Sequence, residues 1–328
     1  MSQRTYLWGM VVALLMAAAL RLAAFGEVPP GLYHDEAIHG LDALDILQGH
    51  FSLYFPANNG REPLFIYLVA ATVGLWGRNP FALRLAAFPA GLLTVAATAA
   101  MGRTLFSRQV GLLAAAVLGV TLWHVHLSRV GFRAVLLPLF IALAIWQGGR
   151  GAKARGSKGA RRHWMAAGVF YGLSFYTYTA ARFTPVALAT FGIYVLVTKP
   201  AIRNTQHATR GRSLTALVTL AALVTVAPLA LHAAAHPDVV LGRPGQVSIF
   251  NPAINSGDLW GTLGAHALRT AGMFFVRGDR IWRHNVPWRP VFDPALGAAF
   301  ALVFLDAMKE LIQTYSQVFQ IQQKQFLV

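Results

Sequence analysis

Two adjacent carboxylates, Asp35 and Glu36, follow a chain-breaking Pro-Pro-Gly sequence and precede a stretch with helical spacing. A carboxylate at the start of a helix can cap free backbone N–H groups, or it can accept the proton of an attacking hydroxyl group as a general base. The spacing leaves both interpretations open. In the stretch that follows, leucines recur every three residues, while Asp42 and Asp45 share another face. This pattern predicts an amphipathic helix along a membrane surface, with these two aspartates on its water-exposed face.

Arginines recur at the predicted outer boundary of the membrane. They are Arg61, Arg84, Arg129, Arg133 and Arg182. The positive-inside rule does not place cations on that face, so another reason is needed for them. The planar guanidinium group suits a phosphate, and a set of arginines near a carboxylate pair fits chemistry on a phosphate-bearing lipid. The alternative is that each arginine snorkels or pairs locally with an acid.

Other polar residues nearby give weaker signals. His34 and His39 bracket the two acids without the H-E-x-x-H spacing of a zinc-binding helix. Tyr176 and Tyr178 fit an aromatic belt at the membrane interface first and a contact to a sugar second. We therefore take His34, Tyr176 and Tyr178 as candidate substrate contacts.

The composition is that of a membrane protein. Apolar residues make up 56% of the 328 residues and charged residues only 12%, which is about half the charged share of a soluble domain. Apolar runs of spanning length recur, as at 6–25, 81–101 and 214–235. The net charge of +16 would suggest nucleic acid in a soluble protein. In a membrane protein the positive-inside rule and attraction to anionic lipids explain it, so membrane lipids are expected partners and nucleic acid is not.

Basic and acidic residues are separated along the chain. The segments 102–109, 148–163 and 199–213 carry bases and no acid, so we expect them to be cytoplasmic loops. Acids gather in 26–80 and 236–292, which are expected to be external loops. The carboxylate pair is therefore predicted to lie on the extracytoplasmic side of a multi-pass protein of the cell membrane.

The sidedness of these loops limits the number of crossings. An odd number of spans must connect the first external loop to the basic segment at 148, and the apolar stretch 63–77 is too short to cross a core of about 30 Å. We interpret it as an interfacial or re-entrant helix. Seven crossings then precede the second external loop, and an eighth begins at 293 but is apolar only to 305. The glutamine-rich tail, 306–328, differs from the rest. It is either a polar tail helix or, in the interpretation that we favour, the result of a truncation or frame change.

Several sequence blocks, in this order, resemble the GT-C glycosyltransferases of the protein O-mannosyltransferase type, which include the bacterial transferases that put aminoarabinose on lipid A. The blocks are YHDEAIHGLDAL, REPLFIYL, FALRLAAFPAGLLTVAATAAMGRTLFSRQVGLLAAAVLG, WHVHLSRVGFRAVLLPLF and GLSFYTYTAARFTPVAL. The resemblance implies an all-α fold, with residues 1–305 forming a seven-helix GT-C-like transmembrane core and an incomplete eighth helix. The family continues with further spanning helices, so the chain is interpreted as a shortened member.

The resemblance also implies a reaction. Family members move a sugar from a polyprenyl-phosphate donor to a hydroxyl group of a lipid, glycan or protein acceptor, with inversion at the anomeric carbon. Asp35 matches the general base of the family, with Glu36 beside it, and the boundary arginines are the candidates for holding the donor phosphate. Glu62 lies where some members hold a metal ion, so a divalent metal ion is a candidate cofactor and no other is expected.

A transporter or flippase for an anionic lipid-linked substrate is the alternative. Transporters usually show internal repeats and charges near the middle of the membrane. The sequence shows no repeat, and its acids gather in the predicted external loops. The transferase is therefore the favoured interpretation.

Overall fold

The computed structural model describes residues 1–154, 156–198, 207–240, 248–306, 308–309 and 313. Within these residues the regular elements are helices, and the extended pairing is an isolated antiparallel bridge between Phe55 and Arg61. The prediction of an all-α protein is therefore confirmed.

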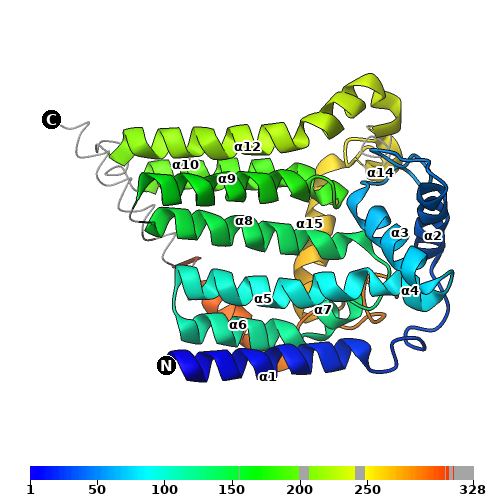
Figure 1. Cartoon of the computed structure of the whole chain (residues 1–328), viewed down its shortest axis with the longest axis horizontal. Helices are drawn as coiled ribbons and strands as arrows, with labels where there is room; N and C mark the ends of the chain where they lie inside the picture. The colour runs from blue at the N-terminus through cyan, green and yellow to red at the C-terminus, as the bar shows by residue number, and fades with distance from the viewer. Residues whose placement is uncertain (155, 199–206, 241–247, 307, 310–312, 314–328) are drawn as a thin grey trace.

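A row of helices with nearly parallel axes forms the body of the molecule (Figure 1). These helices are α1 (Gln3–Leu22), α5 (Ala87–Leu105), α6 (Arg108–Val120), α8 (Leu136–Lys153), α9 (Ser157–Ser174), α10 (Thr184–Thr198) and α12 (His207–Ala235). Along the row, α1 packs on α6, α6 on α5, α5 on α8, α8 on α9 and α9 on α12.

Small residues allow this close packing. A Cβ atom added to Gly111 of α6 would lie 2.6 Å from the carbonyl oxygen of Ala99 in α5. One added to Gly168 of α9 would lie 2.4 Å from the carbonyl oxygen of Val218 in α12. Glycine at these points lets the helix backbones approach closely, which is typical of helix packing in membranes.

The length and apolar character of the helices fit a multi-pass membrane protein. Four stretches are long and apolar enough to cross a membrane: Gln3–Leu22, Pro80–Leu105, Arg133–Lys153 and Ser213–Ala235. Shorter apolar helices include Arg108–Val120 and Pro294–Asp306. The body of the molecule follows the predicted order of crossings, but their exact number stays a prediction.

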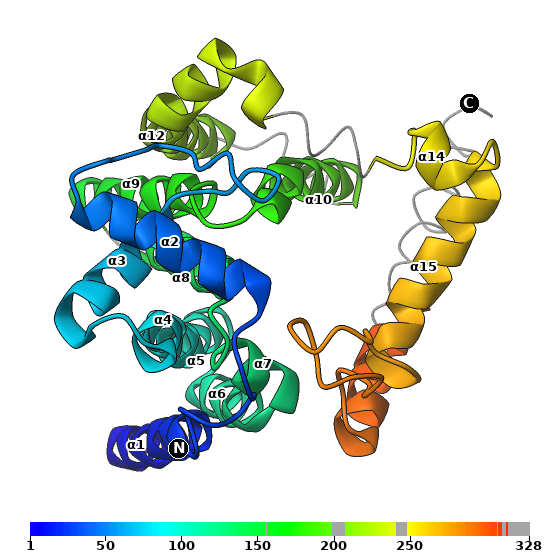
Figure 2. The ribbon, with the colours of Figure 1, turned by 90° about the vertical axis from the view of Figure 1, so that its right-hand side faces the viewer.

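Three further helices cover the end of the bundle opposite the N-terminus. They are α2 (His34–Leu47), α3 (Leu64–Trp76) and α4 (Pro80–Leu85), and α2 lies across the helix ends (Figure 2). With 13 residues, α3 is roughly 20 Å long and too short to span the membrane core. It ends at Gly77, whose φ of 82° favours glycine. Phe65 and Ile66 of α3 are fully buried in the apolar cluster that fixes α2 and α4 to α5.

The predicted loops contain more helix than the sequence suggested. In the segment 148–163, α8 continues to Lys153 and α9 begins at Ser157, so the expected basic loop is largely helical. Lysine, arginine and alanine form helices readily. Packing against neighbouring helices compensates for the low helix propensity of the glycines between them. The second external loop contains α14 (Pro252–Asn255) and α15 (Leu259–Phe275), which lies apart from the bundle (Figure 2). Most of the segments 199–213 and 306–328 falls outside the described residues, so the predictions for them stay open.

Candidate functional site

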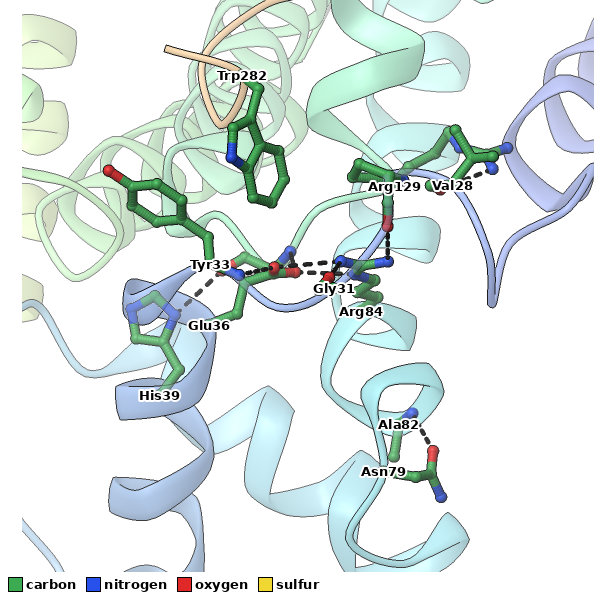
Figure 3. A network of polar contacts seen from close by, with 12 residues as sticks. Val28, Gly31, Tyr33, Glu36, His39, Asn79, Ala82, Arg84, Arg129 and Trp282 are labelled. Carbon is green, nitrogen blue, oxygen red and sulfur yellow. Dashed lines mark hydrogen bonds and ion pairs between the residues drawn. The ribbon is translucent and has the colours of Figure 1, made fainter.

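Glu36 is the capping carboxylate of α2. Its Oε2 accepts a hydrogen bond of 2.9 Å from the N–H of Tyr33, and its Oε1 accepts one of 2.8 Å from the N–H of Gly131. The guanidinium group of Arg84 donates to the same carboxylate, with Nε 3.0 Å from Oε1 (Figure 3). The Glu36 side chain is 2% exposed. All of its neighbours in these contacts are protein donors, so Glu36 fixes the start of α2 to α4 and to the loop at Gly131.

Arg84 completes this arrangement. Besides Glu36, it donates to the carbonyl oxygens of Pro29, at 2.8 Å, and of Gly31. These are the residues of the chain-breaking turn before α2. The ion pair thus holds the turn and the helix in one position, and the Arg84 guanidinium is directed at groups of the protein itself.

Asp35 points to different partners. Its Oδ1 accepts a hydrogen bond of 2.7 Å from Asn58 Nδ2 and lies 2.9 Å from His34 Nε2, and its Oδ2 forms an ion pair with Arg283. Among the hydrogen bonds of the described residues, no backbone N–H donates to Asp35. Its side chain is 12% exposed and His34 is open to solvent. Both carboxylates are largely buried, and Asp35 is the more accessible of the two.

Arg283 is a site residue that sequence reasoning missed. Its guanidinium group lies over the ring of Tyr33, 4.7 Å from the centroid, and 5.3 Å from the centroid of Phe132. Burial lowers the pKa of Arg283. The indole of Trp282 also meets Tyr33 edge to face (Figure 3). No local pattern indicates this pairing, because Arg283 and Asp35 lie in two different segments, both predicted to be external loops.

The loop that carries Arg283 is docked on the bundle by two further hydrogen bonds. Nε2 of His126 donates to the carbonyl oxygen of Trp282 at 2.5 Å, and Nε1 of Trp123 donates to that of His284 at 2.8 Å. Both donors belong to α7 (Leu122–Leu127). The hydrogen bonds to the residues before and after Arg283 therefore fix its position beside Asp35.

A second charged cluster surrounds Glu62. Thr179 Oγ1 donates to Glu62 Oε1 at 2.9 Å, while Arg182 and Arg133 lie 3.4 Å from Oε1 and Oε2, respectively. The carboxylate is fully buried, but Arg133 and Arg182 are partly exposed, at 14% and 27%. Arg133 also lies over the ring of Tyr178.

Phe132 links the two clusters. Its ring meets Tyr178 at 5.7 Å and lies beneath Arg283. The structure thus brings Asp35, Arg283, Arg133 and Arg182 to the same end of the bundle, although four separate loops supply them.

The remaining arginines of the predicted set have internal partners. Arg61 is fully buried, forms an ion pair with Asp42 and donates to the carbonyl oxygen of Ala57 at 3.0 Å. Burial raises the pKa of Asp42 in spite of Arg61. The prediction that Asp42 lies on the water-exposed face is therefore wrong, because Arg61 approaches it from the neighbouring loop. Asp45 is exposed as expected.

Arg129 closes the end of α1. It donates to the carbonyl oxygens of Leu20, Arg21, Ala24 and Val28, at 2.9 to 3.1 Å. The last carbonyl groups of a helix lack partners within the helix, so Arg129 satisfies them and the turn after them. The binding of a donor phosphate by Arg129 stays a prediction. In this structure its guanidinium group is bonded to these carbonyl oxygens instead.

The candidate substrate contacts and His39 fall in different places. His34 is exposed beside Asp35, and Tyr178 faces Arg133, whereas Tyr176 donates to the carbonyl oxygen of Thr225 at 2.8 Å and packs on α12. His39 is buried, and its Nδ1 donates to the carbonyl oxygen of Gly131 at 3.1 Å. Burial and the nearby Arg61 and Arg133 lower the pKa of His39 to about 3, so its ring is neutral.

Comparison with known proteins now gives the family. Over residues 60–232, more than half of the chain, the sequence matches the family described as dolichyl-phosphate-mannose-protein mannosyltransferase. The chain belongs to this family. It is thus a membrane protein of the GT-C superfamily, as the resemblance implied. The matched region includes Glu62 and all five boundary arginines but begins after Asp35.

A solved structure supports the GT-C fold of this mannosyltransferase-family chain. The oligosaccharyltransferase of Archaeoglobus fulgidus in its apo form is similar with a TM-score of 0.50 and 16% sequence identity. The likeness covers 87% of this chain and 39% of the archaeal one, so the chain spans about two fifths of that protein's length. At this identity the likeness shows the fold alone. A comparison with curated protein sequences gives no match.

The surroundings of Glu62 do not fit a divalent metal ion. In the described part of this GT-C chain, no group of three His, Cys, Asp or Glu residues could hold one. The groups nearest Glu62 are two arginines and a threonine, and two positive charges beside a carboxylate oppose a bound cation. The metal ion named for Glu62 stays a prediction without support from these contacts.

Proposed function

We propose that this protein moves a sugar from a polyprenyl-phosphate donor to a hydroxyl group of a lipid, glycan or protein acceptor at the extracytoplasmic face of the membrane. The observation that carries the proposal is the division of roles between the adjacent carboxylates. Glu36 takes backbone and Arg84 donors. Asp35, although also largely buried, is the more accessible of the two, and its charged partners are side chains such as Arg283. Residues 1–305 would act as one transferase unit.

Asp35 is the proposed general base. As the acceptor oxygen attacks the anomeric carbon, Asp35 takes the hydroxyl proton, so a full positive charge does not build up on that oxygen. The bond between the anomeric carbon and the phosphate oxygen breaks at the same time, and the lipid phosphate leaves with the electron pair. Attack from the side opposite the phosphate inverts the configuration.

Arg133 and Arg182 are the proposed partners of the departing phosphate. Both are partly exposed, and both face only one shared carboxylate, Glu62, in the ion pairs of the described residues. Their two positive charges exceed the one negative charge of Glu62, so the cluster can stabilise the charge that develops on the phosphate. Glu36, Arg84 and Arg129 are positioning residues in this proposal, because their contacts fix the loop that carries Asp35.

Charge distribution supports the extracytoplasmic placement of the site. The links between α5 and α6 and between α8 and α9 lie at the end of the bundle near the N-terminus (Figure 1). The helix ends beside these links carry bases such as Arg103, Arg108 and Lys153. Asp35 and the helix α2 lie at the opposite end. The positive-inside rule assigns the basic end to the cytoplasm.

The test is sugar transfer in membranes from cells that produce the chain. Radiolabelled polyprenyl-phosphate mannose and polyprenyl-phosphate aminoarabinose serve as donors, and wild type is compared with Asp35→Asn. We expect transfer to fall about 100-fold or more. Asp45→Asn is the matched control, because Asp45 is exposed on the same helix, and it should keep wild-type activity. Transfer that survives Asp35→Asn would remove the proposed base, and no transfer by wild type with either donor would contradict the proposed reaction.

A further inference from the structure

A cleft lined by basic side chains opens at the end of the bundle opposite Asp35. The C-terminal ends of α5 and α8 meet the beginning of α9 there, at the end where the N-terminus lies (Figure 1). Its volume is about 330 Å³, and its lining consists of Arg103, Thr104, Arg150, Lys153, Ala154 and His163. None of these residues belongs to the proposed transfer site.

Glycines bring the cationic side chains together. A Cβ atom on Gly149 would lie 3.1 Å from side-chain atoms of Thr104 and Leu105 in α5, and one on Gly151 would lie 2.8 Å from the indole of Trp164 in α9. The backbone of α8 therefore runs close to both neighbours at this point. Arg150 and Lys153, which are one helical turn apart, face the same cleft as Arg103.

The cleft has a surplus of positive charge. Arg103, Arg150 and Lys153 are exposed, and no ion pair among the described residues includes them. Their present contacts are neutral: Arg103 lies over the ring of Tyr6, Arg150 over that of Trp146, and Lys153 donates to the carbonyl oxygen of Thr104. Three cations held by rigid helix ends, with no carboxylate lining the cleft, form a site for an anion.

Apolar groups beside the cleft indicate that the anion belongs to a lipid. Leu105, Phe106 and Ile145 are exposed, with 72% of Phe106 accessible. In a membrane helix such surfaces face acyl chains, and the indoles of Trp146 and Trp164 mark the interface between acyl chains and headgroups. A free phosphate would use the cations but would leave this apolar surface without a role.

We propose that the cleft binds the phosphate headgroup of an anionic phospholipid, with the glycerol phosphate at Arg103, Arg150 and Lys153 and the acyl chains along α5 and α8. Basic pockets between helices on the cytoplasmic side of a membrane are suited to such headgroups. The proposal does not depend on the sugar-transfer reaction.

A photoreactive phosphatidylglycerol tests this site directly. The whole chain is placed in nanodiscs of phosphatidylcholine with a trace of phosphatidylglycerol that carries a diazirine in its headgroup, and labelled peptides are mapped by mass spectrometry. We expect label on the peptides that contain Thr104 and Ala154. Each cation near a headgroup contributes about a factor of five in binding, so Arg103→Gln with Arg150→Gln should reduce this label about 25-fold. Lys153 is kept, because it bonds the end of α5.

The matched control is Lys158→Gln with Arg161→Gln, which removes two cations of a neighbouring pocket at the same end of the bundle. Label at Thr104 and Ala154 should then change less than about threefold, since the remaining attraction is screened by salt. Equal losses in the two double variants would overturn the site, because they would show only general attraction of lipid to a basic surface. Displacement of the label by millimolar glycerol phosphate would assign the cleft to a soluble phosphate instead. Both variants should keep the wild-type unfolding temperature, and loss of label from the cleft double variant with that temperature unchanged supports the proposal.

Discussion

Replacing Glu36 by glutamine should destabilise the protein much more than replacing Asp35 by asparagine. Glu36 accepts hydrogen bonds from Tyr33, Gly131 and Arg84, and its side chain is 2% exposed. Glutamine would leave the buried Arg84 without a counter-charge and would point an N–H₂ group at N–H donors. Removal of one partner of a buried ion pair lowers the free energy of unfolding by about 3–5 kcal/mol.

Asp35 is held differently. Its side chain is 12% exposed and the paired Arg283 is 17% exposed, so water can solvate both groups after the substitution. Asparagine keeps the size of the side chain and can still hydrogen-bond to Asn58. A loss of about 1–2 kcal/mol is expected, smaller than for Glu36→Gln, because asparagine keeps the bond to Asn58 and water reaches part of the pair.

The assay measures unfolding and transfer on the same preparations. Thermal unfolding in detergent, followed by tryptophan fluorescence, should place Glu36→Gln about 10 °C below wild type and Asp35→Asn at most about 5 °C below it. Transfer by Glu36→Gln should recover at low temperature, where the variant is folded, while Asp35→Asn should stay inactive. If Glu36→Gln unfolds like wild type but fails to transfer sugar, the reasoning is refuted and Glu36 takes part in the chemistry.

Three further predictions concern other parts of the chain. His39, with its pKa of about 3, stays neutral when folded, whereas an unfolded histidine takes a proton below a pH of about 6.5. The contribution of His39 to the free energy of unfolding should therefore be complete above pH 6.5 and should fall by about 1.4 kcal/mol per pH unit as the pH drops toward 3. The His39→Gln variant, titrated in detergent, should lack this slope. Gly168→Ala should lower the free energy of unfolding by about 1–3 kcal/mol, because its Cβ would meet the carbonyl oxygen of Val218 at 2.4 Å. Gly192→Ala, with nothing within 4 Å, is the control and should not destabilise; equal melting of the two variants would contradict the packing argument. Arg129→Gln should lower the free energy of unfolding by about 2–4 kcal/mol through its lost bonds to carbonyl groups, with the KM for the lipid donor unchanged. A raised donor KM at unchanged stability would show instead that Arg129 binds phosphate.

Residue types and spacing predicted part of the candidate site. They identified Asp35, Glu36, Glu62 and the boundary arginines as the polar residues that need an explanation, because charge is unexpected there in an apolar chain. They did not tell capping from reactivity, since two adjacent carboxylates share the same local sequence. Nor did they reveal Arg283, which reaches Asp35 only through the docking of a distant loop on α7.

The sequence by itself determined that this protein belongs to the membrane and is built of helices. Apolar runs, the low share of charge and the segregation of bases from acids are local or additive properties, so they predict membrane helices and sidedness without knowledge of any contact. The tertiary structure alone decided which carboxylate takes backbone donors and which is the more accessible. The partners that make this difference, Arg84 and Gly131 for Glu36 and Arg283 for Asp35, come from distant segments, and only packing brings them within hydrogen-bonding distance.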